Sequence, residues 1–291
     1  MTAWLVELAG AAEAAEEVPN YTAFASAGRV RPILATQLLR AAEVGGLLDA
    51  RLELNTYHLL GLLGEPLGPW IGAELELREQ GPVVGLLAAA DVPAVLSPPP
   101  RAVFAPCASR APRFLEVGRV DATEVDARGS ELGSGQFEYV LPRASSSNTL
   151  LALPLVRSQG EVFVGLELRD LPSVQAFTGR SRFATCPAWR LPRTITNLEL
   201  AEAWLSEQLR WQFGARRLRA WPLGGKYYPA SGVAPEVVYP LAVEMDGQSV
   251  RDTALSFLPL REVMQQRQLI EDGHLLIALW RAAHAVGVLG S

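Results

Sequence analysis

The most constraining feature of this sequence is a pair of apolar runs that meet at a short polar turn. Residues 149–157 read TLLALPLVR and residues 161–169 read EVFVGLELR, and Ser158, Gln159 and Gly160 separate them. Two β-rich runs joined by so short a turn predict an antiparallel hairpin. Both runs are apolar enough to be covered by other elements. We therefore expect both strands to be buried inside a sheet.

Helical and strand-like patterns alternate after this hairpin. A helical pattern runs from Asn197, a favourable N-cap residue, to Gly214, a favourable C-cap residue. Strand patterns follow at residues 217–222 and 237–245, and a helical region over 261–286 closes the chain. Strands that alternate with helices in this way predict an α/β fold in which a sheet lies between helices.

The first third of the chain has a different character. Residues 3–17 and 32–49 are helix-prone, and a shorter helix around 56–63 ends at Gly64. From Trp70 onward, the alternating run IGAELELRE and the apolar run VVGLL indicate β structure.

A proline-rich stretch over residues 97–113 interrupts these patterns and is the candidate linker. The character of the chain changes across it, from mainly helical to alternating strands and helices. We therefore predict a mainly helical α+β N-terminal domain over residues 1–110 and an α/β domain over residues 111–291.

Composition and charge exclude several classes of protein. The chain has a net charge of -5 over 291 residues and its basic residues are scattered, so it has no broad surface for duplex nucleic acid. No apolar stretch reaches membrane-spanning length, and the acidic N-terminus is not a secretory signal. The two cysteines form no CxxC pair. We expect a cytoplasmic protein with no nucleic-acid or membrane partner.

One segment combines the loop Trp-Arg-Leu-Pro at residues 189–192, Glu199 at the start of a helix, and a helix end at Gly214. This segment resembles a Nudix box, whose family pattern is glycine, five residues, glutamate, seven residues, and Arg-Glu-apolar-x-Glu-Glu-x-Gly. With its last glycine on Gly214, the pattern places its first glycine on Arg193 and its first glutamate on Glu199. Its other charged positions fall on Glu207, Gln208, Trp211 and Gln212.

The resemblance implies that the usual metal site has been lost. The family's glutamates hold magnesium or manganese against a diphosphate, and such ions need carboxylate or other oxygen ligands. Here an indole and two carboxamides occupy ligand positions, and a carboxamide brings no charge to offset the dehydration of the ion. We therefore predict no metal, no cofactor and no conventional magnesium-dependent diphosphohydrolase activity.

Three further segments are the loop YYPASGVAPE at residues 227–236, the tail DGHLLIA at 272–278 and the strand patterns over 114–142. Together they resemble the ADP-ribose and nucleotide-sugar pyrophosphatase branch of the Nudix family. The resemblance implies a Nudix-type α/β/α sandwich, an additional sheet that builds a homodimer, and a catalytic role for Glu236. Beside Lys226, Glu236 is equally interpreted as a solvated loop residue.

The candidate site follows from these positions. The candidate catalytic residues are Glu199 and Glu236. The candidate ligand-binding residues are Trp189, Arg193, Gln208, Gln212, Lys226, Tyr227 and Tyr228.

The tryptophans have two interpretations. Trp189, in the loop before the box, is as good a candidate for stacking on a ligand ring as for core packing. Trp204 and Trp211 are expected in the core because they share a helical face with Leu200.

These features lead to three hypotheses. The first is a Nudix-like protein whose cleft binds a small nucleotide, phosphorylated or acyl metabolite without a metal. The second is an enzyme with metal-independent chemistry that uses Glu199, Glu236, Tyr228 or His274 as acid or base. The third is a structural or regulatory subunit whose N-terminal helices bind another protein.

Overall fold

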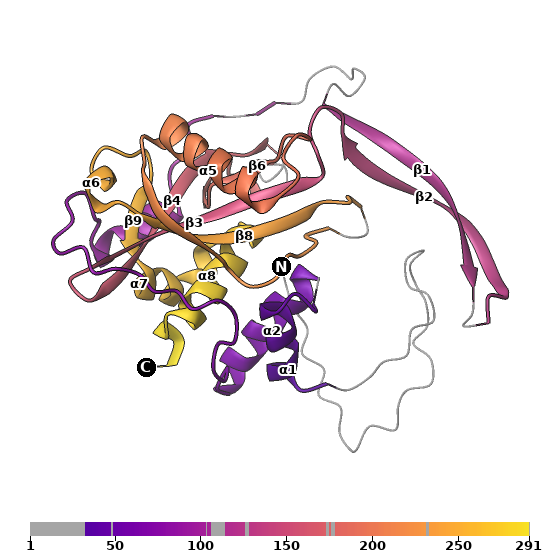
Figure 1. Ribbon diagram of the computed structural model, residues 1–291, viewed down its shortest axis with the longest axis horizontal. Coiled ribbons are helices and arrows are strands. Elements are labelled where there is room, and N and C mark those ends of the chain that lie inside the picture. Colours follow the sequence, from indigo (N-terminus) through magenta and orange to yellow (C-terminus); the bar gives the residue numbers. More distant parts are fainter. Residues whose placement is uncertain are drawn as a thin grey trace.

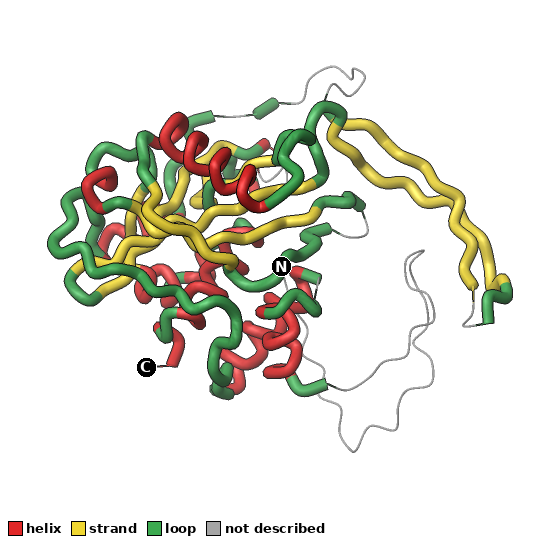
Figure 2. The backbone as a smooth tube through the Cα atoms, in the orientation of Figure 1, coloured by secondary structure: helices red, strands yellow, loops and turns green. Residues whose placement is uncertain are grey.

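The structure is a computed structural model that describes residues 33–47, 49–102, 104–105, 114–125, 128–172, 175, 178–230 and 233–290. Within these residues the protein is a mixed α/β fold built on an open sheet with helices on both sides (Figures 1 and 2). The helix predicted over 3–17, most of the candidate linker and Cys107 lie outside the described residues.

A seven-stranded sheet with the central order β5-β4-β3-β8-β7 forms the middle of the molecule, with β6 on β3 and β9 on β4. The paired strands β3 and β8 are parallel, and the other described pairs are antiparallel. The strands are β3 (Asn148–Ser158), β4 (Glu161–Asp170), β5 (Arg182–Thr185), β6 (Ala188–Arg190), β7 (Arg217–Pro222), β8 (Val237–Met245) and β9 (Ser256–Pro259).

The predicted hairpin is confirmed as β3 and β4. Ser158 pairs with Glu161, so the loop consists of Gln159 and Gly160. Both loop residues have positive φ, 53° and 77°, as a type I′ turn requires. This turn follows the right-handed twist of the strands and explains why so short a connection suffices.

Helices cover both faces of the sheet. α5 (Leu198–Phe213) lies on one face, and α7 (Leu260–Gln265) and α8 (Gly273–Ala285) lie on the other (Figure 1). The other helical elements with described bounds are α1 (Ala35–Glu43), α2 (Ala50–Leu63), η1 (Ala89–Asp91), α3 (Val92–Leu96), α6 (Gly247–Val250), η2 (Arg267–Leu269) and η3 (Val288–Gly290).

The side chains of β3 alternate between two cores, as the period of a strand dictates. Leu150 and Ala152 belong to the cluster that contains Leu205 of α5. Leu151 and Leu153 belong to the cluster that contains α8. Both faces of β3 are covered, in keeping with its uninterrupted apolar run over residues 150–156. The predicted sheet between helices is confirmed.

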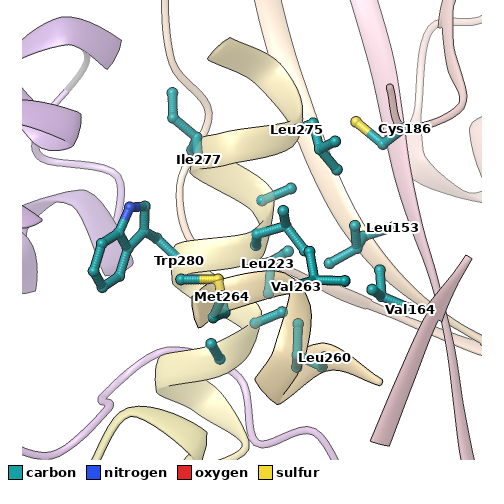
Figure 3. Packing of buried hydrophobic residues seen from close by; sticks show 14 of the residues in the cluster. Leu153, Val164, Cys186, Leu223, Leu260, Val263, Met264, Leu275, Ile277 and Trp280 are labelled. Carbon is teal, nitrogen blue, oxygen red and sulfur yellow. The ribbon is translucent and has the colours of Figure 1, made fainter. Parts of the chain in front are cut away.

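Helix α8 is buried on both of its sides. Leu275 points to the sheet on the side of Cys186, whereas Trp280 points away from it toward the N-terminal helices (Figure 3). Tyr57 of α2 stacks on Trp280 with ring centroids 5.0 Å apart. The same cluster contains Leu39 of α1. The described N-terminal helices therefore pack onto the α/β part of the chain, and the boundary near residue 110 stays a prediction.

Several element boundaries differ from the sequence predictions. The β structure predicted from Trp70 onward is wrong, since residues 70–88 contain only isolated bridges, such as Glu79 with Arg157. This segment touches the sheet at single residues and does not pair with a strand along its length. The predicted closing helix over 261–286 is divided, with η2 and a short loop between α7 and α8.

Trp211 corrects another prediction. It was expected in the core, but its exposed fraction is 79%, and Leu200 on the same helix is 44% exposed. Trp204 is half-buried and packs edge-on against Trp189, with ring centroids 6.1 Å apart. The shared helical face is therefore not the buried face of α5.

A separate two-stranded ribbon projects from the body of the molecule (Figures 1 and 2). It consists of β1 (Leu115–Val125) and β2 (Glu131–Pro142), which pair antiparallel. These are the strands expected over 114–142. Among the described residues, no helix is long and apolar enough to cross a membrane.

Candidate functional site

A cavity of about 390 Å³ lies between the first turn of α5 and the amino ends of the parallel strands β3 and β8. Strand register brings Leu150 of β3 opposite Tyr239 of β8 at its floor. The loop after β7 forms the facing wall. The lining residues are Asn148, Leu150, Leu191, Ile195, Thr196, Asn197, Ala201, Pro222, Gly224, Lys226, Tyr239, Pro240 and Leu241.

Local capping fixes the roof of the cavity. The Asn197 side chain accepts a hydrogen bond from the Leu200 N–H at 2.9 Å and so begins α5 at this point. At the other end, Gly214 closes the helix with a φ of 66°. The predicted capped helix is thus confirmed, and its amino end, which carries partial positive charge, opens onto the cavity.

Lys226 is the charged residue of the described lining, which contains no carboxylate. It is also the single lysine in the printed sequence, where the other basic positions are arginine. Its ammonium group is a compact point charge with three donors, unlike the planar fork of arginine. Around it the lining is mainly apolar, with amide and hydroxyl groups from Asn148 and Thr196. This arrangement suits a ligand with an apolar body and an anionic end.

The candidate carboxylates are placed outside this lining. Glu199 is exposed on the first turn of α5. Glu236 accepts a hydrogen bond from the Thr149 hydroxyl at 2.5 Å and pairs with the Arg190 guanidinium at 3.2 Å. Both carboxylate oxygens of Glu236 are therefore held by neighbouring side chains, and this geometry gives Glu236 a structural role at the start of β8.

Trp189, which precedes the box, and the box position Gln212 meet away from the cavity. Trp189 is 9% exposed and its Nε1 donates to Oε1 of Gln212 at 2.8 Å. Trp189 also packs against Phe213, with ring centroids 6.2 Å apart. In the described residues Trp189 therefore serves the core between β6 and α5, and Gln212 satisfies its indole N–H.

The remaining candidates are dispersed. Gln208 is half-buried on α5, and Arg193 is exposed, with its guanidinium near the carbonyls of Arg143 and Ser145. The Tyr228 carbonyl accepts from the Ala50 N–H at 3.5 Å. Of the candidate residues, only Lys226 is in the described lining of the cavity.

Tyr227 is buried on the opposite side of its loop from the cavity. Its hydroxyl lies 2.9 Å from Nδ1 of His274 on α8. Burial is the main cause that raises the pKa of Tyr227 well above its ordinary value. The phenol therefore stays neutral, and together with His274 it ties the loop to α8.

Sequence reasoning missed most of the lining. Asn148, Thr196 and Tyr239 carry no motif, and their relation arises only when two strand starts and a helix start converge. The one available signal was the N-cap at Asn197, which fixed the position of a helix amino end. The strands that lie beneath the amino end of α5 are set by the order of strands in the sheet, which the sequence pattern does not report.

The described residues contain no group of three or more histidine, cysteine, aspartate or glutamate side chains that could hold a metal ion. A scan against protein-family models finds no match for the chain, and a search of the curated proteins finds no relative. Within the described residues, the fold and the site define a mixed α/β protein with an amphipathic cavity under a helix amino end.

Proposed function

We propose that this protein is a Nudix-like, metal-independent binding protein whose cavity under α5 takes a small anionic metabolite. The observation that carries the proposal is the cavity of about 390 Å³, with an apolar lining and Lys226 at its edge. A small nucleotide, a phosphorylated metabolite or an acyl metabolite has the matching chemistry, an apolar or aromatic body joined to an anionic group. The Nudix-type sandwich implied by the box resemblance is part of this proposal.

The first test is a thermal-shift titration with ADP-ribose, UDP-glucose and acetyl coenzyme A, each with and without magnesium and manganese. A ligand that binds only the native state must raise the melting temperature. We expect one of these compounds to raise it equally with and without metal. A shift that requires metal contradicts the proposal, and so does the absence of a shift with every compound at millimolar concentration.

Variants at Lys226 connect the ligand to the cavity. Lys226→Gln removes the charge and should weaken binding about tenfold or more, because a hydrogen bond to a charged group is lost. Lys226→Arg keeps the charge and is the matched control. Equal affinity for the wild-type protein and Lys226→Gln would place the ligand elsewhere.

A second candidate function is metal-independent catalysis. His274 is the candidate acid or base with a defined partner, because its Nδ1 lies 2.9 Å from the Tyr227 hydroxyl. That pair is on the α8 side of the loop, away from Lys226. Turnover of a bound compound that is lost in His274→Gln, with binding retained, would favour this alternative over simple binding.

The protein's partners are also proposed from the structure. The exposed ribbon of β1 and β2 supports the homodimer that the Nudix resemblance implies. A protein partner on the N-terminal helices is the alternative, and it is favoured by the exposed Leu52, Leu62 and Leu63 of α2.

A further inference from the structure

The loop over residues 223–228 forms one wall of the cavity through Gly224 and Lys226. Its other side is held by the N-terminal helices and by α8. Leu223 and Tyr227 are 0% and 1% exposed, so this side of the loop is fully buried. The position of the cavity wall therefore depends on what it is packed against.

The principal anchor is Arg281 of α8, which is 0% exposed. Its Nη1 donates to the carbonyls of Leu223 and Gly225 at 2.8 and 2.7 Å. Its Nε and Nη2 donate to the two carboxylate oxygens of Glu53 on α2 at 2.6 and 2.7 Å. Since a guanidinium is a rigid plane, the carboxylate of Glu53 sets the direction in which Nη1 holds the loop.

A second anchor comes from α1 and is a close backbone contact. The Gly225 N–H donates to the Ala42 carbonyl at 2.9 Å. A Cβ on Gly225 would lie 2.1 Å from the Cα of Gly45, so only glycine allows this approach. Helices α1 and α2 thus each fix the same short loop through a different contact.

We propose that Arg281 is a positioning residue for the cavity, and that through Glu53 and the Gly225 contact the N-terminal helices control whether the cavity can bind its ligand. This inference rests on the proposed function for the ligand itself. The fixing of the loop is independent of any ligand.

Thermodynamic linkage follows from this geometry. Undocking of α1 and α2 would leave the buried Arg281 charge without its counter-ion and the loop without its Gly225 anchor. If docking of the helices strengthens binding in the cavity, occupancy of the cavity must stabilise the docked helices by the same factor. The predicted N-terminal region is then a regulatory element of the binding site.

The test is hydrogen exchange on the full chain without ligand, comparing the wild-type protein with Gly225→Ala and Arg281→Lys. Gly225→Ala breaks the contact with Gly45, whereas Arg281→Lys keeps the charge beside Glu53 but cannot reach both loop carbonyls. We expect the amides of 223–228 to exchange about tenfold faster or more, with β8 amides unchanged, because loop hydrogen bonds are lost. Gly46→Ala is the control, since its Cβ would meet the Ala41 carbonyl at an ordinary 3.5 Å.

A double variant separates positioning from stability. Glu53→Leu with Arg281→Met replaces the buried pair by apolar side chains of similar size, which such sites generally tolerate. We expect this variant to fold, with β8 amides that exchange at the wild-type rate. The amides of 223–228 should nevertheless exchange faster, and the compound that raises the melting temperature of the wild-type protein should bind more weakly. Unchanged loop exchange in the double variant and in Gly225→Ala overturns the inference. If the loop amides exchange faster in the variants but no compound binds the wild-type protein, Arg281 still positions the loop and the proposed function is refuted instead.

Discussion

At the scale of single residues, Glu43 is a carboxyl group buried in the core. It is 4% exposed, its Oε2 accepts from the Ile71 N–H at 2.8 Å, and its Oε1 lies 3.4 Å from Nδ1 of His284. His284 in turn lies 2.8 Å from the Gly68 carbonyl through Nε2. These contacts attach the segment around residues 68–71 to α1 and α8, with a carboxyl group at the junction.

Glu43 predicts a specific pH dependence of stability. Removal from water raises the pKa of its carboxyl above 4.5, and the Ile71 N–H and His284 oppose that shift only in part. Because the folded pKa is above the unfolded one, the contribution is present below the unfolded pKa and is lost as pH rises through the folded pKa. Urea unfolding between pH 4 and 7 should show a flatter profile for Glu43→Gln than for the wild-type protein.

The control for this prediction is Glu65→Gln, which removes the same charge at an exposed position of the neighbouring loop. It should leave the slope of stability against pH as in the wild-type protein. Identical slopes for wild type and Glu43→Gln would show that Glu43 does not cause the dependence.

At the scale of elements, the β3–β4 hairpin contains a residue that its turn does not favour. Gln159 has a φ of 53°, which is costly for residues other than glycine, asparagine and aspartate. Gln159→Asn should therefore stabilise the protein by about 0.5–1 kcal/mol, measured as a higher urea midpoint. Backbone hydrogen bonds from Gln159 and Gly160 to Glu79, at 2.7 and 3.0 Å, do not depend on the side chain that is changed.

Gln268→Asn is the matched control for the hairpin prediction. Gln268 is exposed in η2 and is not among the described positive-φ residues. The same change there should give no gain in stability. A gain at both positions would attribute the effect to composition and not to the turn.

At the scale of the whole molecule, the projecting ribbon lacks a core of its own, and an isolated two-stranded ribbon is marginally stable. Its register places Val120, Ala122 and Tyr139 on one face. The opposite face carries the Arg119–Glu138 ion pair, 2.6 Å apart. In the middle of the ribbon, over residues 118–122 and their partners, one face is therefore apolar and the other is polar, which suits a ribbon covered on one side by a second copy.

The homodimer proposal makes a testable prediction on this ribbon. Val120→Lys charges the apolar face and should convert a dimer into a monomer in sedimentation velocity, because a buried unpaired ammonium is unfavourable. Thr123→Lys places the same charge on the polar face and should remain dimeric. A monomeric wild-type protein would contradict the proposal directly.

The sequence by itself determined the elements that depend on neighbouring residues. The hairpin around Gln159 and Gly160 and the helix between Asn197 and Gly214 form as predicted. Turn chemistry and capping act over a few residues, so one sequence is enough to recognise them. The same local patterns indicated an α/β fold with helices on both faces of a sheet, while the Nudix assignment stays a prediction.

Only the tertiary structure decided which faces are covered and which residues meet. Trp211 was expected in the core and Trp189 was an open candidate for stacking on a ligand, yet the first is 79% and the second 9% exposed. The Glu53–Arg281 pair joins residues 228 positions apart, and no periodic pattern reports such a contact. Local sequence specifies where a helix or a hairpin begins and ends. The burial of a side chain and the position of the cavity wall at Lys226 depend instead on packing against elements from distant parts of the chain.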